Sequence, residues 1–201
     1  MDAWRTLDEP WRASLELAWE AYRAGTIPVG SVVVGADGRI VARGRNRILD
    51  APGIGLAGSR LAHAEIDALS RLPTTDRYRD HILYSTLEPC LLCTAATLLA
   101  TVGRIEYAAS DPYAGGCTGA IDTAHWRRSA PVIGEPLGGL AGRLSAALQS
   151  AFWLARPENP RAAEILEAFG DESRRGGERV LQLDGAAPRL EDALPHLVDC
   201  L

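Results

Sequence analysis

The sequence predicts an α/β protein with a three-layer α/β/α domain, built on a central mixed sheet of about five strands, and a C-terminal α+β extension. The order of elements is the first reason. A helix, a hairpin and then alternating helices and strands favour one sheet with helices on both faces. The size is the second, since 201 residues, 47% of them hydrophobic, are enough for one domain with a sizeable core. A change in composition after "PENP" places the domain at residues 1–156 and the extension at residues 157–201.

The first predicted elements are a helix over residues 8–25 and a β-hairpin. Pro10 suits the opening turn of this helix and Gly25 suits its end. One face of the helix carries large apolar side chains, namely Trp11, Leu15, Trp19 and Tyr22. The segments "PVGSVVV" at 28–34 and "RIVARG" at 39–44 meet at the turn signal "ADGR", which predicts two antiparallel strands.

The remaining elements follow in alternation after a glycine-rich loop that begins at Asn46. Further helices are predicted at residues 61–72, 90–101 and 140–156. Further strands are predicted at residues 81–86, 104–110 and 130–136. In the extension we expect a short helix at 162–169, a polar break, a strand at 179–183 and a last helix at 189–198.

The charge balance argues against a general phosphate-binding surface. The formal net charge is −5, and every cationic side chain is an arginine because the sequence contains no lysine. Four of these arginines cluster in the hairpin and the loop after it, where solvated positions are the favoured interpretation: Arg39, Arg43, Arg45 and Arg47. No apolar run is long enough to span a bilayer, and the N-terminus does not have the pattern of a signal peptide. We therefore expect a cytoplasmic protein without a membrane partner.

Two short motifs carry the candidate chemistry, and each opens a predicted helix. In "EPCLLC", Cys90 and Cys93 are three residues apart, so they share one face of a helix. The first turn of a helix also offers free backbone N–H groups and the positive end of the helix dipole, which favour thiolates. Such a pair is half of a zinc site or a redox dithiol. The other cysteines, Cys117 and Cys200, are expected to be plain thiols.

The second motif, "HAE", supplies the remaining groups. His63 lies at the start of its helix, and it would complete a set of three zinc ligands if the two helix N-termini converge. A tetrahedral zinc ion with three protein ligands keeps one position open for water, which is typical of a catalytic site. Glu65 then has a role as the base and acid that moves protons during the reaction. We therefore expect one Zn²⁺ ion per chain.

These residues resemble those of the cytidine deaminase-like superfamily, in which His-x-Glu and Pro-Cys-x-x-Cys form the zinc site. The segments "PVGSVVVGADGRIVARGRN", "HAEIDAL", "LYSTLEPCLLC" and "GRIEYAASDP" are most similar to the branch of tRNA adenosine deaminases and guanine deaminases. The resemblance implies that His63, Cys90 and Cys93 bind zinc and that Glu65 is the proton shuttle. It also implies a substrate contact from Asn46, backbone amides of Ala64 and Cys90 at the pocket, and a homodimer.

The substrate is less well defined by the sequence. The acidic extension and the long loop after Asn46 favour a small nucleobase or nucleoside, with a purine-like ring preferred. Adenosine-to-inosine conversion at a tRNA anticodon is the alternative, and a zinc-stabilised binding module without catalysis is the second. Within "DPYAGG", Asp111 and Tyr113 are candidates for substrate contacts. Trp126 and Trp153 are candidates for stacking on the ring, although core packing is favoured for Trp153.

Overall fold

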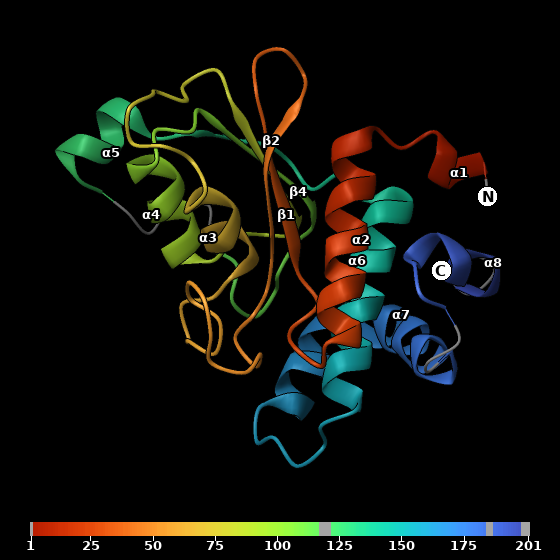
Figure 1. Ribbon diagram of the computed structural model, residues 1–201. Helices are drawn as coiled ribbons and strands as arrows, with labels where there is room; N and C mark the ends of the chain where they lie inside the picture. Colours follow the sequence, from red (N-terminus) through yellow and green to blue (C-terminus); the bar gives the residue numbers. More distant parts are fainter. Residues whose placement is uncertain (1, 117–121, 184–186, 198–201) are drawn as a thin grey trace.

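The computed structural model describes residues 2–116, 122–183 and 187–197 (Figure 1). The predictions for Cys117 and Cys200 fall outside these residues. The strands of the described chain are β1 (Gly30–Val34), β2 (Ile40–Arg45), β3 (Ile82–Leu87), β4 (Arg104–Ala109) and β5 (Val132–Ile133). The helices are α1 (Asp2–Arg5), α2 (Glu9–Arg23), α3 (Ala64–Leu69), α4 (Leu91–Leu99), α5 (Ala124–Ser129), α6 (Gly139–Leu154), α7 (Ala162–Gln182) and α8 (Leu190–Leu197).

The strands form one mixed sheet in the order β2-β1-β3-β4-β5. β1 is antiparallel to β2 and to β3, whereas β3, β4 and β5 run parallel. All five residues of β1 are buried, which agrees with its run of three valines and with its place between β2 and β3. Register places Gly44, Ser31, Ser85 and Tyr107 side by side across four strands.

Helices cover both faces of the sheet, so the predicted three-layer α/β/α class is confirmed. In Figure 1, α3 and α4 lie on one face and α2 and α6 on the other. The face under α2 and α6 buries the apolar stripe of α2 against α6, with Trp11, Leu15, Leu144 and Leu148 in one cluster. The opposite face buries Val33, Leu83 and Ile105 against residues of α3 and the segment after α4. Among the described residues, no helix has the length and apolar character needed to cross a membrane.

The C-terminal extension differs from its prediction. The strand expected at 179–183 is wrong, because these residues belong largely to α7, and the described part of the extension is helical rather than α+β. Gly170 has φ 81° and kinks α7, while the expected polar break continues as helix. Gly177 explains why: a Cβ there would lie 2.6 Å from the backbone nitrogen of Ala151, so α7 and α6 pack at backbone distance. Short helices α1 and α5 were not predicted.

Gly44 sets the position of α3 on the sheet. A Cβ on Gly44 would lie 2.3 Å from the carbonyl oxygen of Ala64 and 2.3 Å from the backbone nitrogen of Ala68. Only a residue without a side chain therefore lets the first turn of α3 rest directly on β2. Since His63 immediately precedes this turn, the same contact fixes where the imidazole begins.

We expect Gly44→Ala to lower the free energy of unfolding by about 1–3 kcal/mol, because the added methyl group overpacks a backbone contact. It should also reduce the metal content of the purified protein, since α3 must move. Urea denaturation and metal analysis measure the two effects. Gly53→Ala is the matched control, because a Cβ there meets only the carbonyl oxygen of Ala51, at 3.8 Å. Equal stability of the two variants would contradict the role of Gly44.

Candidate active site

The candidate metal ligands lie at two helix N-termini on the same face of the sheet. His63 is the N-cap residue of α3, with extended backbone at φ −68° and ψ 154°. Cys90 is the N-cap residue of α4, with φ −69° and ψ 174°. Cys93 lies in the first turn of α4 and is fully buried. His63 and Cys90 thus lie where the chain changes from extended to helical, and Cys93 lies one turn into α4, so all three are beside free backbone N–H groups.

The distances among these three side chains fit a tetrahedral metal. His63 Nδ1 lies 3.7 Å from Cys90 Sγ and 3.4 Å from Cys93 Sγ, and the two sulfur atoms are 3.6 Å apart. A tetrahedron with Zn–S bonds of about 2.3 Å and Zn–N bonds of about 2.0 Å has edges of about 3.5–3.8 Å. One imidazole and two thiolates also form a donor set that zinc prefers. His63, Cys90 and Cys93 are therefore placed to bind a metal ion.

Glu65 lies beside this cluster and is 4% exposed. Its Oε1 accepts a hydrogen bond of 2.9 Å from Ser85 Oγ, and its Oε2 accepts one of 3.3 Å from Cys93 Sγ. Burial raises the pKa of this carboxyl group. Ser85 lies in β3, opposite Ser31 and Tyr107 of the neighbouring strands, and no motif in the sequence indicated it. A carboxylate in this position can exchange protons with a group held at the metal ligands.

The close contacts also shift the pKa values of the ligands. The hydrogen bond between Cys90 and Cys93 lowers the pKa of Cys90 to about 4. The pKa of Cys93 is raised by the hydrogen bond between Cys93 and Cys90, together with burial. The hydrogen bond with Cys90 raises the pKa of His63. One thiolate is therefore stabilised by its neighbours at neutral pH.

A pocket of about 290 Å³ adjoins the cluster and contains His63, Glu65 and Cys90 in its wall. Its other lining residues come from segments far apart in the sequence: Ile27, Val29, Asn46, Leu87, Glu88, Asp111, Tyr113, Ala114, Gln149, Trp153, Arg161, Ile165 and Phe169. The structure thus brings Asn46, Asp111 and Tyr113 to the same cavity as the metal ligands. Arg161, Ile165 and Phe169 belong to the C-terminal extension, which therefore forms part of the pocket wall.

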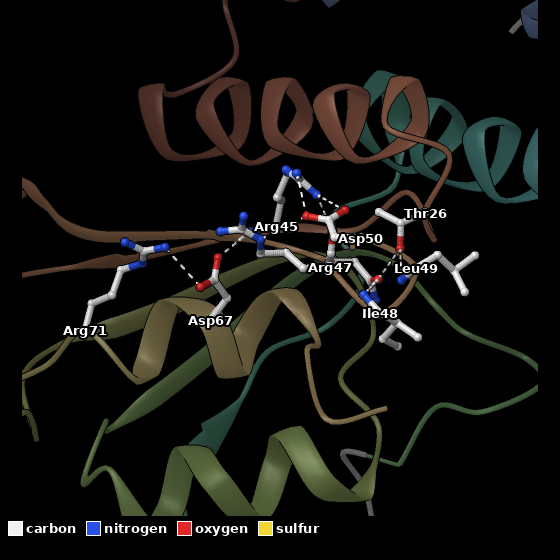
Figure 2. A network of polar contacts seen from close by, with 9 residues as sticks. Thr26, Arg45, Arg47, Ile48, Leu49, Asp50, Asp67 and Arg71 are labelled. Carbon is white, nitrogen blue, oxygen red and sulfur yellow. Dashed lines mark hydrogen bonds and ion pairs between the residues drawn. The ribbon is translucent and has the colours of Figure 1, made fainter. Parts of the chain in front are cut away.

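Asn46 is held in one orientation by a hydrogen-bond network at the start of the long loop. Its Oδ1 accepts hydrogen bonds from Thr26 Oγ1 at 2.8 Å and from the backbone N–H of Ile48 at 3.1 Å. Thr26 Oγ1 in turn accepts one from the N–H of Leu49 at 3.2 Å, and Figure 2 shows Thr26, Ile48 and Leu49 converging there. With Oδ1 occupied in this way, the amide –NH₂ group of Asn46 is the part left to meet a ligand.

An ion-pair cluster reinforces the same loop. Asp50 accepts two hydrogen bonds from Arg45, at 3.1 and 2.8 Å, and one from Arg47 at 3.1 Å (Figure 2). The hydrogen bond from Arg45 lowers the pKa of Asp50. Arg45 is only 20% exposed, so it is not the solvated side chain that the sequence favoured. Its guanidinium also donates to the carbonyl oxygen of Asn46 at 2.8 Å, which ties this cluster to the pocket.

Other predicted contacts have different surroundings. Asp111 Oδ1 accepts hydrogen bonds from the N–H groups of Tyr113 and Ala114, so it shapes the turn as well as lining the pocket. Ala64 is fully buried at the start of α3 and is absent from the described residues that line the cavity. Trp126 lies in α5 and is not among the described residues that line this pocket, whereas Trp153 is one of them.

Gln149 and the extension residues are the contacts that sequence analysis missed. Gln149 is 3% exposed in a helix otherwise built from small and apolar residues around it, "SAALQSAFWLA". The signal that could have identified Gln149 is a lone amide in such a segment, since buried polar groups need partners. Ile165 and Phe169 carried no such signal, because their apolar character is equally typical of core packing.

The mixed sheet and the ligand cluster at two helix N-termini define a metal-binding α/β domain. The chain belongs to the family described as the cytidine and deoxycytidylate deaminase zinc-binding region, whose model matches residues 6–109. The suspected superfamily is thereby confirmed.

Proteins that are similar to this chain have different named functions. The chain is 39% identical over 136 residues to the tRNA(Ile)-lysidine synthase of Deinococcus radiodurans, a match that covers 65% of this chain and 22% of that protein. The chain thus spans less than a quarter of that relative's length. A solved structure from a study of A-to-I editing by tRNA:A34 deaminases is 30% identical, with a TM-score of 0.55, and the match covers 68% of this chain and 95% of that one. The structure of NE0047 in complex with 2,6-diaminopurine is 26% identical, with a TM-score of 0.55, and covers 73% and 82%.

We expect the purified protein to contain about one zinc ion per chain and Cys93→Ser to lose most of it, because a hydroxyl is a poor replacement for a buried thiolate ligand. Metal analysis by mass spectrometry measures both. His81→Ala is the control, since His81 pairs with Asp80 outside the cluster. A zinc-free protein with Cys90 and Cys93 in a disulfide would instead identify a redox pair.

Proposed function

We propose that this chain catalyses the hydrolytic deamination of a nucleobase ring. Water supplies the oxygen that joins the amino-bearing ring carbon, the C–N bond breaks, and ammonia leaves. The observation that carries the proposal is the buried carboxylate of Glu65, which contacts the ligand Cys93 and shares a pocket with His63 and Cys90. A binding module held together by zinc has no need of such a group, so the second alternative is disfavoured.

Each residue has a defined part in this reaction. His63, Cys90 and Cys93 hold the zinc ion, which when bound lowers the pKa of water and so supplies the nucleophile. Glu65 takes a proton from the attacking water and gives it to the departing amino group. Ser85 keeps one oxygen of Glu65 in place, so the other is directed toward the ligands. Asn46 donates a hydrogen bond from its amide –NH₂ group to an acceptor on the ring.

A free nucleobase or nucleoside with a purine-like ring is the substrate that the pocket favours. Trp153 and Phe169 provide flat apolar surfaces, and Ile165 adds an aliphatic one. Because Arg161, Ile165 and Phe169 come from the extension of the same chain, part of the space beside the metal ligands is already covered. The net charge of −5 also favours a small substrate over RNA. The bound 2,6-diaminopurine of NE0047 is consistent with this class.

Adenosine-to-inosine conversion in a tRNA anticodon is the second candidate. The similarity to a tRNA:A34 deaminase structure, most of which this chain covers, favours it. The two candidates require the same chemistry at Glu65 and differ in what lies beyond the ring.

A homodimer is part of the proposal. Leu91, Leu92 and Leu99 of α4 are 48%, 40% and 72% exposed, which leaves an apolar surface next to the site. A second copy of the chain would cover it. A monomeric mass in sedimentation experiments at assay concentration would contradict this part.

We expect ammonia release from at least one member of a panel of guanine, adenine, cytosine and their nucleosides. Glu65→Gln should reduce this release by about 10²- to 10⁴-fold and retain zinc, because the amide keeps the shape of the side chain but transfers no proton. Glu164→Gln is the matched control, on an exposed position of α7. An enzymatic ammonia assay with metal analysis of each variant gives both readouts.

The outcomes separate the candidates. Inosine formation in a tRNA anticodon stem-loop, with no release from the small molecules, would replace the first candidate by the second. Zinc-loaded protein that acts on neither class would identify the binding module.

A further inference from the structure

Gln149 is a buried amide of α6 with one half of its hydrogen-bonding capacity unused. Its Nε2 donates to the carbonyl oxygen of Pro28 at 3.2 Å. Its Oε1 accepts no hydrogen bond from any residue that the structure describes, although Gln149 is only 3% exposed. Gln149 lines the same pocket as His63, Glu65 and Asn46. Gln149 Oε1 is not one of the fully buried polar atoms left without a partner, so this acceptor has accessible surface in a residue that lines the proposed substrate pocket.

We propose that Gln149 is a specificity-determining residue whose Oε1 accepts a hydrogen bond from a ring N–H of the substrate. The inference rests on the proposed function, because it takes the pocket to be the substrate site. It adds a requirement that the reaction itself does not impose, namely that the ring carries an N–H group.

Asn46 and Gln149 form a donor and acceptor pair around one segment of backbone. Gln149 Nε2 binds the carbonyl oxygen of Pro28, and the backbone N–H of Asn46 donates to the carbonyl oxygen of Val29 at 2.9 Å. The side-chain oxygen of Asn46 accepts hydrogen bonds from Thr26 and Ile48, so its –NH₂ group remains for a ligand. The –NH₂ group of Gln149 donates to Pro28, so its side-chain oxygen remains for a ligand. The pocket thus offers one donor and one acceptor to a ring that carries both an acceptor atom and an N–H.

Nucleobases present ring N–H groups of two kinds. Free bases carry one on the nitrogen that bears ribose in nucleosides and RNA. Guanine carries another on N1, beside its carbonyl group, and retains it in the nucleoside. Adenine has only the first kind. Binding of N-methylated bases therefore distinguishes which N–H meets Gln149.

The test measures equilibrium binding by titration calorimetry. The zinc-loaded Glu65→Gln protein, which does not turn over the ligand, is titrated with guanine, 1-methylguanine, 9-methylguanine, adenine and 9-methyladenine. We expect one methyl position to weaken binding by about 5- to 100-fold, because a site built to bind an N–H discriminates against its absence. Weakening by the 9-methyl group identifies the free-base N–H, and weakening by the 1-methyl group alone identifies the lactam N–H.

Adding Gln149→Met removes the acceptor while it retains the length of the side chain. We expect this variant to bind the parent base and its methyl derivative within about 2-fold of each other, since no acceptor remains to distinguish them. Gln182→Met is the matched control, because Gln182 accepts a hydrogen bond from Arg179 outside the pocket, and it should keep the full preference. If Gln149 only positions Pro28, Gln149→Met would weaken the binding of all five bases equally and leave the preference between parent and methyl derivative unchanged.

Several results overturn the inference. Equal binding of every methyl derivative and its parent does so without any Gln149 variant, so the test survives a failure of Gln149→Met to fold. The inference is also overturned if the preference persists in Gln149→Met. It is overturned as well if none of the five bases binds measurably. Ammonia release is not used here. A chain that binds bases with the expected preference but releases no ammonia would therefore overturn the proposed function and leave the role of Gln149 standing.

Discussion

The meeting of two helix N-termini on one face of the sheet is the constraint on which the site depends. Gly44 allows α3 to rest directly on β2, and β3 leads the chain to Cys90 at the start of α4. His63 and Cys90 precede their helices, so their side chains extend from the helix ends and meet at 3.7 Å. Glu65 reaches the same place although it lies two residues after His63. Two residues at this spacing do not lie on the same side of a helix, but both side chains can reach a site beyond the helix end.

The ligand cluster and the layers of the fold could be predicted because both depend on local patterns. A β-branched run, a turn signal and an apolar stripe each specify an element from adjacent residues. The pair of cysteines at three-residue spacing specifies half a metal site in the same way. The strand expected at 179–183 failed because its pattern is also compatible with a helix, and packing decided between them. Gly177 brings α7 within backbone distance of α6, a long-range contact that no local pattern contains.

The walls of the pocket could not be predicted for the same reason. They combine the loop after β2 with α6 and the extension, which lie far apart in sequence. Arg45 illustrates the difficulty, since a cluster of arginines is typical of solvated surface. Here Asp50 pairs with both Arg45 and Arg47, and Arg45 becomes largely buried. The resulting network fixes the loop and, through Thr26 and Ile48, the amide of Asn46. Sequence spacing reveals the residue types in such a network but not their pairing.

The division between catalytic and recognition groups explains why the reaction is easier to infer than the substrate. The proposed catalytic groups lie on two helix ends and one strand, where backbone packing dictates their positions. The proposed recognition depends on a few polar atoms in a largely apolar cavity, and the unused amide oxygen of Gln149 is one of them. Gln149 Oε1 has no partner among the described residues, and a bound ring without an N–H group would cover it unpaired at a cost of about 1–3 kcal/mol. A ring N–H that donates to Oε1 avoids this cost in the complex, so the proposed contact would select rings that carry such a group.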